Sequence, residues 1–229
     1  YTDSASEPFT LHLTSAPDLP EDGVLNGIHQ ADDFEYYYYV NSEVDTAVNG
    51  LVCHDVDGKW YYFENGKLIS TKYDIVEFGE AKYFVANGCL QNDASNSGLQ
   101  LIGDNFYYLA YGQLQEQYTG LVLYDGQWFY VENGVLVIDF HGLQDYDGSK
   151  FLISYGQIRN DYTGLYYDTV SGNWYYIVYG QVQTDYTGLV LYDGAWFYLE
   201  NGKLASDFTG TVEYDGAQFE VYCGQVVTG

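Results

Sequence analysis

The chain has 229 residues, of which 47% are hydrophobic, and a formal net charge of −26 at pH 7. This charge argues against nucleic-acid binding, which needs a basic face, and against attraction to an anionic membrane surface. The sequence holds 28 Tyr and 12 Phe, and tyrosine suits a thin fold because its ring can be buried while its hydroxyl stays wet. No stretch approaches 18 apolar residues, so we expect no membrane insertion.

The first 26 residues differ in composition from the rest. All three prolines, Pro8, Pro17 and Pro20, lie there, which predicts a linker or an irregular cap over residues 1–26. The chain begins with Tyr1 and has no apolar signal-like region, so we expect a mature or excised segment of a larger product.

From residue 27 onward the sequence is repetitive. The phrase Tyr-Thr-Gly-Leu-Val-Leu-Tyr-Asp-Gly-x-Trp-Phe-Tyr stands at 118–130 and again at 186–198, and degenerate copies fill the region around them. A glycine after each aromatic run gives the period, at Gly66, Gly88, Gly112, Gly134, Gly156, Gly180, Gly202 and Gly224. An earlier and more degenerate copy begins at Gly27, so we count nine units over residues 27–229.

The glycines also show a longer period of three units. Their successive gaps are 22, 24, 22, 22, 24, 22 and 22 residues, and Trp60, Trp128 and Trp196 are 68 residues apart. Two interpretations remain open and are compatible. Each unit is rotated by about a third of a turn from the last in a solenoid, or a block of three units was triplicated.

Each unit is predicted to be a β-hairpin. In the clearest copy, two runs rich in aliphatic and aromatic residues, 121–124 and 128–131, flank Asp125-Gly126. This pair is typical of a two-residue turn in which both residues have positive φ. The same Asp-Gly occurs at Asp57, Asp147, Asp193 and Asp215. The later Asn-Gly at Asn133 and Asn201 predicts a second left-handed position where the hairpin ends.

The sequence offers little for catalysis or metal binding. The four histidines are scattered, no Cys-x-x-Cys occurs, and there is neither a nucleophile elbow nor a phosphate-binding loop. We therefore predict no catalytic residue, no cofactor and no metal site, with a calcium site at the unit-junction aspartates as a minor alternative. Cys53 and Cys89 lie about one repeat apart and could pair in an oxidising compartment, which would leave Cys223 over.

The aromatic residues are the remaining candidates for a binding site. Alternate residues of a strand face opposite sides, so one face builds the core and the other can present rings at grooves between hairpins. Such rings stack on sugars or enclose a quaternary ammonium by cation–π attraction; the alternative is that both faces only pack. The predicted ligand-binding residues are Trp60, Tyr62, Trp128, Tyr130, Trp174, Tyr176, Trp196 and Tyr198.

These motifs resemble the cell-wall-binding repeats of Gram-positive surface proteins, a superfamily with choline-binding, glucan-binding and toxin receptor-binding members. The resemblance covers residues 27–229 and rests on the ordered Thr-Gly-Leu, Asp-Gly-x-Trp-Phe-Tyr and Asn-Gly landmarks. It implies an all-β fold, a left-handed β-solenoid of tandem hairpin repeats with about three hairpins per turn.

The resemblance also implies a choline cage, which this sequence carries only in part. The second cage tryptophan matches Trp60, Trp128, Trp174 and Trp196, and the methionine position holds Leu68, Leu136 and Leu204. The first cage tryptophan is replaced at Leu51, Leu99, Leu121, Leu143, Leu165, Leu189 and Thr211. Loss of one ring lowers a cation–π site by about 0.5–2 kcal/mol, so a choline-like cation is one of several expected partners.

The leading hypothesis is a non-catalytic, acidic, carbohydrate-binding module on the bacterial cell surface or secreted from the cell. It would tether a protein to cell-wall polymer, glycan or a choline-like cation through repeated weak sites. The alternative is a structural stalk, or a surface fibre or adhesin built from the same repeats that self-associates end to end. A remote alternative is part of a cell-wall hydrolase whose catalytic domain lies outside this chain.

Overall fold

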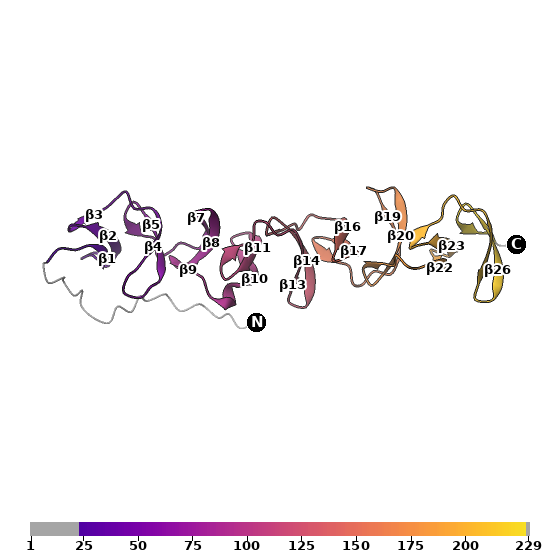
Figure 1. Ribbon diagram of the computed structural model, residues 1–229, viewed down its shortest axis with the longest axis horizontal. Helices are drawn as coiled ribbons and strands as arrows, with labels where there is room; N and C mark the ends of the chain where they lie inside the picture. The colour runs from indigo at the N-terminus through magenta and orange to yellow at the C-terminus, as the bar shows by residue number, and fades with distance from the viewer. Residues whose placement is uncertain (1–22, 228–229) are drawn as a thin grey trace. The chain divides into compact units, whose positions relative to one another are not determined.

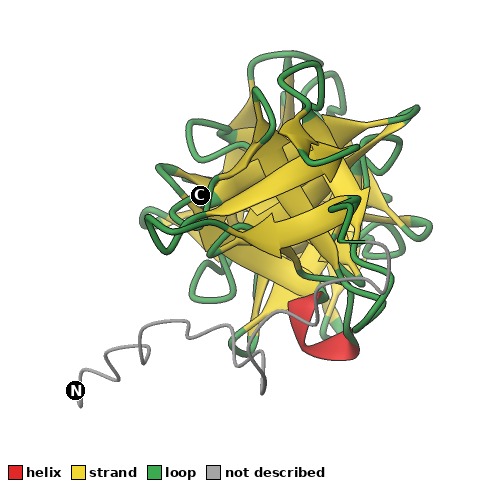
Figure 2. Cartoon of the chain, turned by 90° about the vertical axis from the view of Figure 1, so that its left-hand side faces the viewer, coloured by secondary structure: helices red, strands yellow, loops and turns green. Residues whose placement is uncertain are grey.

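The computed structural model describes residues 23–227, and the predicted all-β class is confirmed there. The chain divides into a first unit that ends at Glu116 and a second that begins at Gln117. The predicted linker or cap over residues 1–26 lies outside the described residues up to residue 22. Among the described residues, no helix is long and apolar enough to cross a membrane. The one helical segment described is the short turn η1, Ala94–Asn96 (Figure 2).

The strands follow one another in groups of three, and Figure 1 shows the groups in chain order. The first unit contains β1 Gly27–Gln30, β2 Tyr36–Val40, β3 Glu43–Val44, β4 Gly50–Cys53, β5 Trp60–Glu64, β6 Lys67–Leu68, β7 Asp74–Phe78, β8 Ala81–Ala86, β9 Cys89–Leu90, β10 Gly98–Ile102, β11 Asn105–Ala110 and β12 Gln113–Leu114. The second contains β13 Gly120–Tyr124, β14 Gln127–Glu132, β15 Val135–Leu136, β16 Gly142–Tyr146, β17 Ser149–Ser154, β18 Gln157–Ile158, β19 Gly164–Asp168, β20 Asn173–Val178, β21 Gln181–Val182, β22 Gly188–Tyr192, β23 Ala195–Glu200, β24 Lys203–Leu204, β25 Gly210–Tyr214, β26 Ala217–Tyr222 and β27 Gln225–Val226.

Two tight turns shape most of the groups, as in β13–β15. Tyr124 pairs with Gln127, and the intervening Asp125 and Gly126 have φ of 48° and 75°. Glu132 pairs with Val135 across Asn133-Gly134, where φ is 50° and 74°. Both are two-residue turns with positive φ at both positions, as Asp-Gly and Asn-Gly predict. The two-residue third strand was not predicted, because so short a segment carries no periodic signal.

The prediction of a two-residue turn at Asp57 is wrong. Cys53 pairs with Trp60, so a loop of residues 54–59 joins the two strands. The His54 N–H donates to the Lys59 carbonyl at 2.8 Å, and the Asp57 carboxylate accepts from the Lys59 N–H and the Tyr61 hydroxyl. The hairpin from Gly50 to Phe63 is two residues longer than the hairpin from Gly120 to Val131. The hydrogen bonds of Asp57 therefore stabilise a wider loop.

Successive groups are joined by main-chain pairing. The second strand of one group pairs with the short third strand of the next, as Tyr61 pairs with Cys89 and Phe151 with Gln181. The same pairing joins β2 to β6, β8 to β12, β14 to β18, β20 to β24 and β23 to β27. A two-stranded hairpin alone is marginally stable in water, so these contacts between groups are what an array needs.

The periodic glycine lies at the centre of this junction. The Gly156 carbonyl accepts from the Tyr130 N–H of the preceding group at 2.7 Å, and its own N–H donates to the Phe140 carbonyl at 3.1 Å. Its φ is 70°, and an added Cβ would lie 2.7 Å from the Val137 carbonyl oxygen. Both the backbone conformation and the close approach of another backbone therefore require glycine here.

The repeated Tyr-Thr-Gly-Leu phrase also has a structural explanation. The Tyr118 hydroxyl donates to the Leu121 carbonyl at 2.6 Å, and the Thr119 hydroxyl accepts from the N–H of Asn133, the first residue of the second turn, at 3.1 Å. The same pair of bonds recurs at 162–165 and 186–189. The tyrosine thus stabilises the segment that leads into the first strand, and the threonine accepts a hydrogen bond from a turn N–H that the strands leave unpaired.

The core is built from one face of each second strand together with the first strand. Phe63, Val131, Ile177 and Leu199 have no exposed surface, and the leucines that replace the first cage tryptophan, such as Leu121 and Leu165, are buried as well. Their burial explains why a smaller, aliphatic residue occupies the position: its side chain packs in the core.

Tyrosine burial makes the fold sensitive to alkali. Burial, with a hydrogen bond to the charged Glu132, raises the pKa of Tyr130 to about 12. The folded chain keeps this proton at a pH where the unfolded chain loses it, so the stabilisation is complete below pH 10 and is lost as pH rises through about 12.

We expect the free energy of unfolding to fall over this interval, by at most about 1.4 kcal/mol per pH unit for such a group. Urea denaturation at several pH values measures it. A Tyr130→Phe variant with an unchanged alkaline slope would contradict the assignment.

Candidate aromatic binding cavities

Two cavities in the second unit are built from the same positions of the repeat. One has a volume of about 510 Å³ and is lined in part by Leu121, Trp128, Tyr146, Asp147, Phe151 and Ile158. The other has a volume of about 300 Å³ and is lined by Leu165, Trp174, Tyr192, Asp193, Phe197 and Leu204. We call them the Trp128 cavity and the Trp174 cavity. Because strand pairing places the six residues of each at matching positions, one rule of the repeat generates both.

Consecutive hairpins supply the aromatic walls. Trp128 on β14 lies 6.1 Å, centroid to centroid, from Tyr146 at the end of β16. Trp174 on β20 lies 6.4 Å from Tyr192 at the end of β22, with the rings tilted by 58°. These separations fall within the range of favourable aromatic pairs, but the rings do not stack flat on each other. Each pair therefore keeps ring surface directed at the cavity.

Glycine positions the second wall. An added Cβ on Gly164 would lie 3.1 Å from the Tyr192 ring, and one on Gly120 would lie 3.2 Å from the Tyr146 ring. Both distances are tighter than ordinary van der Waals contact, so the glycine of Tyr-Thr-Gly-Leu lets the next hairpin's tyrosine approach the backbone closely.

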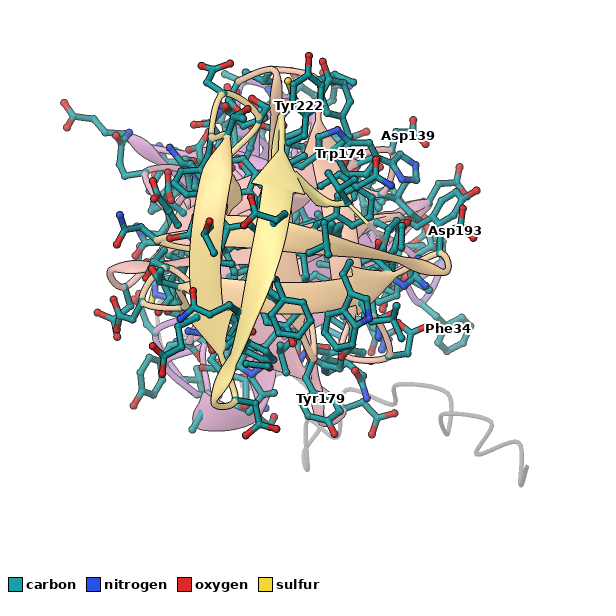
Figure 3. The ribbon with its side chains drawn as sticks, turned by 90° about the vertical axis from the view of Figure 1, so that its right-hand side faces the viewer. Phe34, Asp139, Trp174, Tyr179, Asp193 and Tyr222 are labelled. Carbon is teal, nitrogen blue, oxygen red and sulfur yellow. The ribbon has the colours of Figure 1, made fainter. Side chains whose placement is uncertain are left out.

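The electrostatics of the cavities favour a cation. Each cavity has one aspartate at its lining, Asp147 or Asp193, and neither lining includes a lysine, arginine or histidine. Figure 3 shows Trp174 and Asp193 in the upper right part of the view, whereas Tyr179 lies at the bottom. Aromatic faces and a carboxylate both attract positive charge.

The structure distributes the predicted site residues unevenly. Trp128 and Trp174 line the cavities, and Trp196 contacts Tyr214 at 6.2 Å in the corresponding arrangement of the last two hairpins. Tyr130 is only 3% exposed and belongs to a core cluster. Tyr176 and Tyr198 are half-buried beside Tyr186 and Phe208, at 4.9 and 4.7 Å.

In the first unit, Trp60 has a different neighbour. Its ring lies 5.1 Å from Phe78, which takes the place of the cavity tyrosine, and Gly79 stands where the aspartate would be. The Lys72 ammonium lies over the Tyr62 ring, 5.0 Å from the ring centroid. A protein cation thus already occupies one face of Tyr62, and the Trp60 junction lacks the carboxylate of the other two.

Sequence reasoning missed the residues contributed by the following hairpin. Tyr146, Tyr192, Phe151 and Phe197 line the cavities but were not predicted. The available signal was the Tyr-Asp-Gly of the repeated phrase, whose aspartate was interpreted only as a turn residue. It has positive φ in the turn and lines the cavity as well.

Two other reactive side chains, Asp57 and Cys89, have shifted pKa values. Burial raises the pKa of Asp57, but hydrogen bonds from Tyr61, Lys59 and His54 outweigh it and hold this pKa below its ordinary value. Burial raises the pKa of the Cys89 thiol, which makes it a poor nucleophile. All three cysteines are free. Within residues 23–227 no three His, Cys, Asp or Glu side chains are grouped so as to hold a metal ion.

Comparison with known proteins gives the following matches. The family model described as choline-binding repeat matches residues 47–69, 117–137 and 185–205. No curated protein matches the chain. Among solved structures, CbpJ from Streptococcus pneumoniae TIGR4 is 22% identical over 84% of this chain, with a TM-score of 0.40. Choline binding protein F from Streptococcus pneumoniae is also 22% identical over 84%, with a TM-score of 0.38. This chain covers 62% and 61% of those two chains.

Proposed function

We propose that this chain, a member of the choline-binding repeat family, is a non-catalytic, extracellular binding module that tethers a secreted or surface protein to choline-bearing or glycan polymer of a bacterial cell envelope. The observation that carries the proposal is the recurrence of one cavity, with tryptophan, tyrosine and phenylalanine rings and an aspartate, at matching positions of the repeat. The match of residues 47–69, 117–137 and 185–205 to the choline-binding repeat model also supports a cell-wall-binding module.

Within this proposal, the repeats of residues 27–229 form the binding module, and residues 1–26 are a linker or cap. We further propose that the hairpins of each unit wind as a left-handed solenoid with about three hairpins per turn. The pairing of each second strand with the third strand of the next group supports a regular winding.

The aromatic and acidic lining supports a quaternary ammonium as the ligand group. Such a cation cannot donate a conventional N–H hydrogen bond, and aromatic faces bind it through their negative potential. Leu121 and Leu165 replace a ring of the family cage, while Phe151 and Phe197 add rings of their own to the lining. Each site is therefore expected to be weak alone, and tethering would rely on several sites engaging one polymer.

Choline titration tests this function. Calorimetry of the whole chain is expected to show saturable binding that weakens with salt, because charged contacts at exposed sites are screened. Asp193→Asn keeps a residue that tolerates the left-handed turn but removes the charge, and it should weaken binding at the Trp174 cavity by about fivefold. Asp125→Asn makes the same change in the β13–β14 turn, which lines neither cavity, and serves as the control. No choline binding, or equal losses in both variants, would overturn the proposal.

A further inference from the structure

The two cavities differ at their outer residues. Besides the six shared positions, the lining of the Trp128 cavity includes Ser149, Asn160, Tyr179 and Gln181. At the equivalent positions around the Trp174 cavity stand Ala195, Ser206, Cys223 and Gln225, and none of these belongs to its lining. The Trp128 cavity is also larger, at about 510 Å³ against about 300 Å³. The additional volume is therefore bordered by hydroxyl and amide groups and one further aromatic ring.

Tyr179 comes from a third hairpin and is held in an unfavourable backbone conformation. It is the first residue of the turn between β20 and β21, with φ of 48°. The same turn position holds asparagine at Asn65, Asn87, Asn133 and Asn201, and tyrosine also at Tyr111 and Tyr155. Asparagine tolerates the left-handed region far better than a bulky aromatic residue does. Tyr179 is 75% exposed, so the fold gains little burial in return for this strain.

The polar groups around Tyr179 keep hydrogen-bonding capacity. The Gln181 amide nitrogen donates to the Ser149 hydroxyl oxygen at 3.1 Å, which leaves the Gln181 carbonyl oxygen as an acceptor and the Ser149 O–H as a donor. The Asn160 amide nitrogen lies 3.4 Å from the Gln127 side-chain oxygen, and the Asn160 carbonyl oxygen remains an acceptor. A ligand with adjacent hydroxyl groups can both donate to and accept from such a set.

We propose that the Trp128 cavity is a two-part site, in which Tyr179, Ser149, Asn160 and Gln181 bind a pyranose ring beside the cation pocket, whereas the Trp174 cavity binds the cation alone. A sugar ring combines an apolar face, which stacks on tyrosine or tryptophan, with hydroxyls on its edge. The inference rests on the proposed function, because it assigns a sugar to one of the same cavities. It makes Tyr179 a specificity-determining residue.

Two probes, choline and a neutral glucose trisaccharide, test this inference when each is titrated alone into the whole chain. The trisaccharide is expected to bind at one site, with loss of binding in Trp128→Ala and little change in Trp174→Ala. Tyr179→Asn should weaken trisaccharide binding about tenfold, as expected for the loss of one stacking ring. Tyr111→Asn is the matched control, since Tyr111 occupies the same turn position with φ of 50° but does not line this cavity.

Stability measurements separate a binding role from a structural one. Both tyrosine-to-asparagine variants should raise the urea midpoint, because each relieves the same left-handed strain, while only Tyr179→Asn weakens the trisaccharide. An unchanged trisaccharide affinity in Tyr179→Asn, or equal losses in Trp128→Ala and Trp174→Ala, would overturn the inference. Choline binding without trisaccharide binding would overturn the inference alone, whereas the absence of choline binding would overturn the cation site of the proposed function.

Discussion

Gly156→Ala is expected to lower the free energy of unfolding by about 3 kcal/mol or more, as the sum of left-handed strain and overpacking. The new Cβ would lie 2.7 Å from the Val137 carbonyl oxygen and 3.2 Å from Leu136 Cδ1. Relief would require movement of the backbone that holds the Tyr130 N–H to Gly156 O and Gly156 N–H to Phe140 O hydrogen bonds. Urea denaturation followed by circular dichroism measures the loss.

Gly148→Ala is the matched control in the same hairpin. Gly148 has φ of 74°, close to the 70° of Gly156, but an added Cβ there meets no atom within 4 Å. It should therefore cost only the strain of the left-handed conformation, about 1–2 kcal/mol. The difference between the two variants isolates the packing between successive groups. Equal losses would show that the periodic glycine is needed for its φ alone and not for the junction.

Trp174→Ala is expected to weaken choline binding at its cavity by about 10- to 30-fold, which corresponds to the loss of a strong cation–π contact. Trp174 is 38% exposed, so its removal should disturb the fold far less than removal of a core residue. In calorimetry the whole-chain binding isotherm should lose one site, while the Trp128 site is retained.

Tyr222→Ala provides the control for loss of an exposed ring. Tyr222 is 65% exposed in the same unit and lies outside both cavities; Figure 3 shows it with Trp174. Choline affinity should be unchanged in this variant. If both variants bind like the unsubstituted chain, the Trp174 cavity is not a choline site. If both weaken binding equally, the effect comes from general surface or stability changes.

The local structure of the repeat could be predicted because its turns use residues with a specific conformational preference. Asp125-Gly126 and Asn133-Gly134 specify left-handed residues at fixed spacing, and the runs between them specify strands. The unequal steps of 24 residues could not be interpreted from spacing. One comes from a four-residue loop between Asp168 and Asn173, and the other from the longer connector that contains η1.

The candidate site was only partly predictable for a related reason. Strand alternation places Trp128 and Phe129 on opposite faces, but it does not say which residue of the next hairpin lies opposite each ring. The cavity walls Tyr146 and Tyr192 depend on that register, which is set by pairs such as Phe129 with Gln157. The sequence of one unit alone therefore indicates one wall of each cavity but not the other.

The most direct test of the proposed cation sites is an NMR measurement of nuclear Overhauser effects between the N-methyl protons of bound choline and the aromatic rings. We predict contacts to Trp128 and Tyr146 in one cavity, and to Trp174 and Tyr192 in the other, since these rings line the two cavities. Saturation with choline without contacts to either tryptophan–tyrosine pair would contradict the cation sites proposed here.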